Sequence, residues 1–127
     1  MQILLDTHII IWLVENPKQL SQKVLDILTD KKTKIYYSLA SIWELAIKAG
    51  IGRIEIDLSI LLDTLKQNDI KPLQILETHI IKVKDLPAVH KDPFDRILIA
   101  QAISENLQLF TRDTILQGYS KKLVNLV

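Results

Sequence analysis

The organisation of the chain is decided by the stretch Ile3-Leu4-Leu5-Asp6-Thr7-His8, in which three apolar residues end on a carboxylate. The chain continues as Ile9-Ile10-Ile11-Trp12-Leu13-Val14. An apolar run bounded by a polar turn is typical of a buried strand that leads into a helix. In an open parallel sheet, functional residues gather just beyond the carboxyl ends of the strands. The stretch therefore predicts that Asp6 lies at the functional edge of a sheet.

The composition is that of a chain able to form a full hydrophobic core. Hydrophobic residues make up 48% of its 127 residues, and its mean hydropathy is +0.17. We therefore expect one ordered domain that spans residues 1–127. The 16 Lys+Arg balance 15 Asp+Glu to a net charge of +1. This balance excludes a grossly basic nucleic-acid-binding protein, but it allows a local basic rim.

The cellular setting is constrained by what the sequence lacks. There is no cysteine, so disulfides and thiolate metal sites are excluded and a reducing compartment is allowed. Asp6 interrupts the first apolar run at once, so we expect no signal peptide. No apolar stretch approaches the roughly 20 residues that span a bilayer. We expect a cytoplasmic protein without a membrane partner.

Apolar runs and helical patterns alternate along the whole chain. We expect strands at residues 3–5, 35–38, 73–76, 107–111 and 123–126. Helices are expected up to about residue 14, from Ser21, up to about residue 49 with a stop at Gly50, and at about residues 58–67, 80–83 and 92–106. This alternation predicts an α/β fold with a parallel sheet and helices on both faces.

Acidic residues fall at four places where a strand ends or a helix begins. Asp6 closes the first strand, and Asp113 follows the strand at 107–111. Glu44 lies early in the helix after the second strand, and Asp95 lies in the first turn of the helix at 92–106. Because these places share one edge of a parallel sheet, we expect the four carboxylates to converge there.

Each of these acids also has a purely structural interpretation, which for Asp95 is that an acidic residue in the first turn of a helix suits the helix dipole. Asp6 can cap the helix that it precedes. Ser41 and Glu44 have the spacing of a capping box, and Glu44 can also pair with Lys48 one turn later. Asp113 can be an ordinary turn residue. Taken one at a time, Glu44 and Asp113 are explained by structure, so the functional signal lies in the conjunction.

Asp95 favours a functional interpretation. It precedes the apolar run Ile97-Leu98-Ile99-Ala100, which implies a buried helix, and a carboxylate in such surroundings needs a partner or a metal. Clustered carboxylates without a cation repel, and some stay protonated. Mg²⁺ and Mn²⁺ prefer oxygen ligands, and such an ion binds a phosphodiester and activates water. The cluster predicts a metal-dependent phosphoryl-transfer site, most economically a nuclease.

Four stretches also carry a family resemblance: LLDTHIIIWL, SLASIWELAIKAGIGRI, LPAVHKDPFDRILIAQA and LFTRD. In this order they resemble the PIN domain, and specifically the VapC-type toxins of type II toxin–antitoxin systems. The resemblance implies a three-layer α/β/α sandwich around a mostly parallel sheet of about five strands. It also implies an endoribonuclease that uses Mg²⁺ or Mn²⁺, one or two ions, with an RNA substrate. Its partners would be a second copy, in a homodimer, and a small cognate antitoxin.

Under this resemblance, the acidic positions of the family motif fall on Asp6, Glu44, Asp95 and Asp113. Asp6 and Asp95 would be the principal metal ligands. Glu44 and Asp113 would bind a second ion or act through bound water.

Several neighbours of the acids receive supporting roles. Thr7 and Thr111 flank the acids and would orient them by hydrogen bonding. Arg96 and Arg112 adjoin the acids and would contact substrate phosphate or balance charge. His8 stands where many relatives have Asn, and we interpret it as a polar residue at a helix start rather than as a ligand.

Other polar and aromatic residues are given weaker interpretations. Asp92 is expected to cap the helix at 92–106, and neighbouring His90 is assigned no role. Trp12 and Trp43 sit among aliphatic residues, so we interpret them as core or interface packing rather than as base-stacking platforms. The basic residues that would line an RNA path are Lys48, Arg53 and Lys91.

Three other classes of protein are alternatives to a nuclease. A receiver-like signalling domain needs a second acid beside the first, whereas Asp6 is followed by Thr7 and His8. A haloacid-type phosphatase needs an Asp two residues after the first, where His8 stands. A non-catalytic PIN-like scaffold for protein interaction or RNA binding is the stronger alternative, since a fold alone does not fix function. The presence of all four acids favours catalysis.

Overall fold

A sheet of five parallel strands forms the centre of the computed structural model, which describes all residues from 1 to 127. The strands are β1 (Gln2–Leu5), β2 (Lys34–Ser38), β3 (Ile70–Leu73), β4 (Gln108–Thr111) and β5 (Val124–Leu126). Their order in the sheet is β3-β2-β1-β4-β5, and every neighbouring pair is parallel. The α/β fold with a five-stranded parallel sheet is therefore confirmed.

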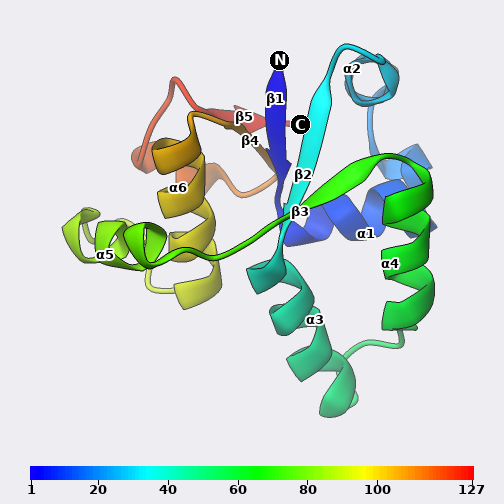
Figure 1. The fold of residues 1–127 in the computed structure, drawn as a ribbon, viewed down its shortest axis with the longest axis horizontal. Helices are drawn as coiled ribbons and strands as arrows, with labels where there is room; N and C mark the ends of the chain where they lie inside the picture. The colour runs from blue at the N-terminus through cyan, green and yellow to red at the C-terminus, as the bar shows by residue number, and fades with distance from the viewer.

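Helices cover both faces of this sheet. They are α1 (Thr7–Glu15), α2 (Gln22–Thr29), α3 (Leu39–Gly50), α4 (Leu58–Gln67), α5 (Glu77–Asp85) and α6 (Pro93–Glu105), with short 3-10 turns at Pro17–Gln19 and Thr114–Gly118. Figure 1 shows α5 and α6 on one side, and α1, α2 and α4 on the other. None of the helices is long and apolar enough to cross a membrane.

The central strand β1 is buried on both of its faces. Ile3 and Leu5 pack into one apolar cluster with side chains of α1, α2 and α4. Leu4, which points the opposite way, packs with Leu98 and Ile99 of α6. Successive side chains of a strand point to opposite faces, so a strand between two helical layers must be apolar throughout. This explains why three consecutive apolar residues precede Asp6.

The third strand was expected at residues 73–76. The observed strand β3 spans Ile70–Leu73, so it begins and ends three residues earlier. Ile70 pairs with Ile35 of β2, and Asp69 takes a left-handed backbone conformation, φ 57°, in the turn after α4. Pro72 lies within the strand, which β3 tolerates because it is at the edge of the sheet.

Helix α5 is longer than the expected residues 80–83, since it runs from Glu77 to Asp85. His79 is fully buried and fixes its start, because His79 Nδ1 accepts a hydrogen bond from the N–H of Leu76 at 3.0 Å. The other ring nitrogen, Nε2, lies 2.9 Å from Oε1 of Glu105 in α6. One histidine thus joins α5 to α6.

The expected capping box at Ser41 and Glu44 is wrong. The N-cap of α3 is Ser38, the last residue of β2, whose hydroxyl accepts a hydrogen bond from the Ala40 N–H at 3.0 Å. Ser41 and Glu44 therefore lie inside the helix. At the other end, Gly50 is still helical, and Gly52 is the glycine with positive φ (76°).

The loop between α5 and α6 is fixed by the guanidinium of Arg96. Its Nη1 donates to the carbonyl oxygens of Pro87 at 3.1 Å and His90 at 3.2 Å, and to the hydroxyl of Tyr119 at 3.1 Å. Its Nη2 donates to the carbonyl oxygen of Val83 at 3.0 Å. Arg96 therefore points into the loop rather than towards the acids, which differs from the expected contact with substrate phosphate.

Replacing Arg96 by alanine removes the donors for two loop carbonyls and for the carbonyl of Val83 in α5, so we expect the free energy of unfolding to fall by about 2–4 kcal/mol. The measurement is urea denaturation. The matched control is Arg112→Ala, which removes a guanidinium stacked on Trp12 and is expected to cost about 0.5–1 kcal/mol. Equal losses in the two variants would contradict a structural role specific to Arg96.

Candidate functional site

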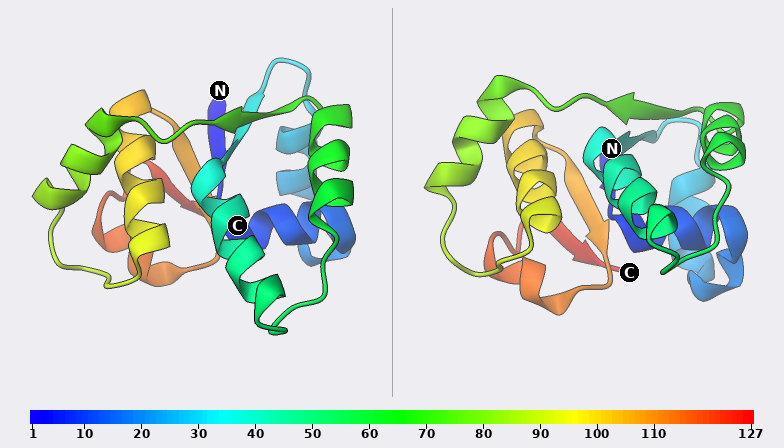
Figure 2. Two further views of the ribbon diagram at one scale, coloured as in Figure 1. Left: turned by 60° about the horizontal axis from the view of Figure 1, so that its bottom comes forward. Right: turned by 90° about the horizontal axis from the view of Figure 1, so that it is seen from below.

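The four expected acids line one cavity of about 460 Å³ at the carboxyl edge of the sheet. Helices α3 and α6, which contribute Glu44 and Asp95, lie side by side there (Figure 2). The complete lining is Asp6, Thr7, His8, Trp12, Glu44, Lys48, Asp92, Asp95, Arg112 and Asp113. Five carboxylates face two basic side chains in this set, so the cavity is strongly acidic.

Asp6 is the buried centre of the cavity, with 5% of its surface exposed. Its Oδ1 accepts a hydrogen bond from the N–H of Thr7 at 2.7 Å, so it caps α1. Its Oδ2 accepts from the hydroxyl of Thr111 at 2.5 Å, which joins β1 to β4. Burial raises the pKa of Asp6, and these two hydrogen bonds oppose that rise.

Glu44 is held from both sides. Its Oε1 lies 2.9 Å from the hydroxyl of Thr7, and its Oε2 lies 3.1 Å from Nζ of Lys48, one turn later on α3. The hydroxyls of Thr7 and Ser41 are also 2.9 Å apart. Because Thr7 has one hydroxyl proton and gives it to the carboxylate, Ser41 donates to Thr7. This chain of bonds fixes α3 against the start of α1.

Asp95 has the most perturbed acidity of the group. Burial raises its pKa to about 7, and repulsion from the carboxylates of Asp6, Asp92 and Glu44 adds to the rise. Nearby His90 opposes it. A carboxylate kept in such surroundings is a functional candidate on physical grounds, because packing alone would favour a neutral residue.

Asp113 is held by three polar contacts. Its Oδ1 accepts from the N–H of Ile115 at 2.9 Å, and its own N–H donates to the Thr111 hydroxyl at 3.0 Å. Its Oδ2 lies 3.3 Å from Nε2 of His90, and the same nitrogen lies 3.0 Å from Oδ2 of Asp95. His90 therefore bridges two of the four acids, a role that the sequence did not indicate.

Two further residues near the acids have definite positions. Asp92 is the expected N-cap of α6, where its Oδ1 accepts from the N–H of Phe94 at 2.8 Å. His8 is exposed at the start of α1, with its ring 6.3 Å from that of Trp12. The groups able to ligate a metal together are His90, Asp95 and Asp113, and His8 is not among them.

The two tryptophans lie in different surroundings: Trp12 is partly buried and packs against the larger core cluster, whereas Trp43 lies at the surface. Trp12 lines the acidic cavity, and the guanidinium of Arg112 lies 5.0 Å from the centre of its ring. Trp43 is 61% exposed and makes an edge-to-face contact with Phe94 at 5.1 Å. The expectation of core packing is therefore wrong for Trp43, whereas interface packing stays a prediction.

A second cavity of about 410 Å³ adjoins the acidic one and shares Glu44, Lys48 and Asp92 with it. Its lining also includes Arg53 and Phe94, so a basic and an aromatic side chain lie next to the acids. Lys91 is exposed and lines neither cavity.

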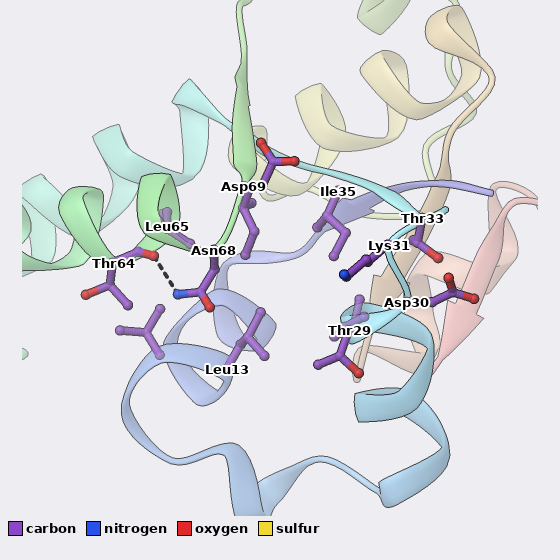
Figure 3. A pocket seen from close by; sticks show the side chains of 13 residues that line it. Leu13, Thr29, Asp30, Lys31, Thr33, Ile35, Thr64, Leu65, Asn68 and Asp69 are labelled. Atoms are coloured by element: carbon purple, nitrogen blue, oxygen red, sulfur yellow. Dashed lines mark hydrogen bonds between the residues drawn. The ribbon is translucent and has the colours of Figure 1, made fainter.

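The largest cavity, about 560 Å³, lies between the carboxyl ends of α1, α2 and α4 (Figure 3). It shares no residue with the acidic cavity. Leu13, Ile35 and Leu65 are among its apolar lining residues, and Asn68 donates to the carbonyl of Thr64 at 2.7 Å. It gathers no group of side chains able to ligate a metal, so size alone does not mark the functional site.

The acidic cavity fits a hard divalent cation. Its donors are carboxylate oxygens from four separate elements, and burial, together with repulsion from Asp6, Asp92 and Glu44, raises the pKa of Asp95. Mg²⁺ and Mn²⁺ bind such oxygen sets. Among the acids, Asp95 and Asp113 have carboxylate oxygens that lie, together with a ring nitrogen of His90, within 4.8 Å of one another.

A comparison with models of protein families identifies the family of this chain. The model of the PIN domain matches residues 3–122, which is nearly the whole chain. The chain belongs to the PIN domain family. No curated protein sequence matches it. All four acids of the cavity lie inside the matched residues.

Solved structures of other proteins share this PIN fold over their whole length. VapBC2 from Rickettsia felis, bound to a DNA fragment from its promoter, gives a TM-score of 0.77 at 16% identity, covering 99% of this chain and 98% of that one. DNA-bound VapBC from Salmonella typhimurium gives 0.71 at 14%, with the same coverage. VapBC-1 from nontypeable Haemophilus influenzae gives 0.65 at 19%, covering 98% and 97%. At these identities the likeness establishes the fold.

Substituting Asp95 by asparagine is expected to stabilise the metal-free protein at pH 8 by about 1–3 kcal/mol, because it removes a charge that burial and neighbours disfavour. The direction in which stability changes with pH follows from the raised pKa of Asp95. The folded state binds more protons than the unfolded one between pH 3.8 and about 7, so wild-type stability falls as the pH rises through that window. Denaturation in chelator from pH 4 to 8 measures this slope, which should be smaller in the variant.

The matched control is Asp63→Asn, which changes an exposed acid of α4 and should leave the pH dependence unchanged. A D95N protein less stable than the wild type at pH 8 would contradict the view that the charge of Asp95 is unfavourable in the folded protein.

Proposed function

We propose that this PIN domain is a metal-dependent endoribonuclease that hydrolyses RNA phosphodiester bonds and acts as the toxin of a toxin–antitoxin pair. The observation that carries the proposal is the convergence of the four motif acids on one open cavity. A scaffold without activity has no need to keep an acidic cluster that costs stability.

Asp6 and Asp95 are the proposed principal metal ligands, with Glu44 and Asp113 completing the site. When bound, a divalent ion neutralises the scissile phosphate and lowers the pKa of attacking water. Thr7 and Thr111 hold the oxygens of Glu44 and Asp6 in fixed directions. Fixed ligands matter because the groups that orient a metal site contribute strongly to its activity.

The basic side chains around the cavity suit an RNA backbone. Arg112 lies over the ring of Trp12, and its Nη1 donates to the carbonyl oxygen of Gln19 at 3.5 Å, which leaves its other donors for phosphate. Lys48 lines both the acidic cavity and the adjoining cavity, and Arg53 lines the adjoining one. We propose that the strand runs from Arg112 across the acids towards Arg53. Arg96 is not part of this path, because its donors are used within the loop.

The proposed protein partners are an antitoxin and a second copy of the chain, in the cytoplasm. Solved structures similar to this one include three described as VapBC and one as FitAcB from Neisseria gonorrhoeae. They support the proposal of a small antitoxin, since the fold is shared over nearly the full length.

An apolar stripe on α3 supports the proposed homodimer. Every fourth residue of this helix face is apolar and exposed: Leu39 at 41%, Trp43 at 61%, Ile47 at 43% and, just beyond its end, Ile51 at 65%. Residues four apart lie on one side of a helix. A continuous apolar surface of this kind marks a protein interface.

RNA cleavage by the purified protein is expected with Mg²⁺ or Mn²⁺ and is expected to stop in chelator. Asp6→Asn and Asp95→Asn should each lower the rate by more than about 100-fold, since removing a group that merely orients a metal ligand already costs about 10–100-fold. Asp63→Asn, on α4, is the control and should retain full activity. Cleavage that survives in chelator or in both variants would overturn the assignment and leave the scaffold function.

The dimer is tested with Trp43→Glu, which places a charge in the apolar stripe and should convert a dimer to a monomer. Light scattering gives the mass in solution. Ile60→Glu is the matched control, because Ile60 is equally exposed (62%) but lies on α4. A mass unchanged by W43E, or changed as much by I60E, would exclude this face as the interface.

A further inference from the structure

The ring of His8 lines the acidic cavity, yet its nitrogens are not used by the protein. His8 is exposed in the first turn of α1. Of the three histidines, His79 and His90 use both ring nitrogens in polar contacts. The ring of His8 takes part in no hydrogen bond or salt bridge, and its aromatic neighbour is Trp12.

Trp12 gives the ring of His8 a fixed support. The two residues are four positions apart on α1, so they lie on one side of the helix. Their ring centroids are 6.3 Å apart, with the planes at 49°. Trp12 is partly buried against the larger core cluster, and the cap provided by Asp6 fixes where α1 begins. The imidazole is therefore held at the cavity wall by a rigid neighbour, with part of its surface open.

The guanidinium of Arg112 lies over the same tryptophan. It is 5.0 Å from the centre of the Trp12 ring, and its Nη1 donates to the carbonyl oxygen of Gln19 at 3.5 Å. Arg112 is exposed and forms no salt bridge, although it lines a cavity with five carboxylates. Trp12 therefore links an exposed aromatic ring to a cation without an acidic partner.

The cavity offers carboxylates and flat groups from different elements. Glu44 comes from α3 and Asp95 from α6, whereas His8 and Trp12 come from α1. Arginine binds phosphate, whereas nucleobases are neutral and flat and stack on aromatic side chains. Because Arg112 and His8 meet at Trp12, they match the phosphate and the base of one nucleotide.

Other roles do not account for the position of His8. Asp6 already caps α1, so the helix does not need His8 for this purpose. The residues with the spacing of metal ligands are His90, Asp95 and Asp113, and His8 is not among them. Its exposure excludes a role in core packing.

We propose that His8 stacks on a base of the RNA and that Arg112 binds the phosphate of the same nucleotide, with Trp12 supporting both side chains. This nucleotide lies beside the one whose phosphate reaches the acids. The inference rests on the proposed function, because it takes RNA as the ligand, and it adds a contact through which a base affects binding. Since stacking strength differs between bases, the site prefers a purine to a pyrimidine.

The test is the affinity for three single-stranded RNA probes of equal length and charge. They are oligoadenylate, oligouridylate and an abasic ribose-phosphate backbone. Fluorescence anisotropy measures their binding to the full-length Asp95→Asn protein, in which the proposed cleavage is blocked. We expect the affinity to fall from oligoadenylate to oligouridylate and again to the abasic backbone.

Two substitutions of His8 in this background separate stacking from other effects. His8→Ala should lower the affinity for oligoadenylate by about 5–10-fold and leave that for the abasic backbone unchanged, because it removes only a stacking partner. His8→Phe should keep the affinity for oligoadenylate, since its ring stacks but carries neither a charge nor a nitrogen. Arg112→Ala should weaken all three probes, because it removes a contact to phosphate.

Several results would overturn the inference. They are equal affinity for the three probes, a loss in H8A that is as large for the abasic backbone, and a loss in H8F that matches H8A. Failure to bind any probe would also overturn it. Equal affinity for probes with and without bases would leave the exposed ring to a protein partner.

The binding experiment requires no cleavage, so it is independent of the proposed activity. A wild-type protein that cleaves no RNA with Mg²⁺ or Mn²⁺ would refute the nuclease function. The expected order of affinities and the effects of H8A and H8F would then still support His8 as a stacking residue of an RNA-binding scaffold. The two failures are therefore distinguishable.

Discussion

Repulsion among the carboxylates at the carboxyl edge of the sheet is the constraint on which the rest of the structure depends. Asp6, Glu44, Asp95 and Asp113 come from four parts of the chain, and each is held by a donor from elsewhere. These donors are Thr7, Lys48, His90 and Thr111. Burial, and after it repulsion from Asp6 and Asp92, raises the pKa of Asp95 to about 7 despite these donors. A cluster of carboxylates that repel one another destabilises the folded protein, but it provides the oxygen ligands that a cation prefers.

The fold supplies rigid positions for this cluster. β1 is buried on both faces, so the place of Asp6 at its end is fixed by packing. Glu44 and Asp95 lie in the first half of helices whose N-caps, Ser38 and Asp92, fix where each helix begins. Sites built on such elements are held more accurately than sites on free loops. The exception is the loop with His90, which the guanidinium of Arg96 fixes instead.

The sequence predicts the parts of this structure that depend on local pattern. The apolar run before Asp6 predicts β1, and the order of strands and helices predicts the parallel sheet and its functional edge. The edge strand β3 is predicted three residues too late, because its polar Lys71 and Pro72 show no buried pattern and its pairing with β2 is decided by tertiary contact. The choice of Ser38 over Ser41 as N-cap depends likewise on where β2 ends.

The candidate site is predicted in its acids and missed in the residues that connect them. His90 and Asp113 are 23 positions apart, and no sequence pattern shows that an imidazole will lie between Asp113 and Asp95. Arg96 shows the opposite error, because adjacency to Asp95 in sequence suggested a role at the site. Neighbouring residues on a helix point in different directions, and Arg96 points into the loop.

The pKa of the Asp95 carboxyl group is the most direct test of whether this cluster binds a divalent cation. Carbon NMR of that carboxyl group, with and without Mg²⁺, gives the pKa in both states. We expect a pKa of about 7 without metal and a fall towards the ordinary value of 3.8 when Mg²⁺ is added. An ordinary pKa in the metal-free protein, or one that Mg²⁺ leaves unchanged, would contradict it.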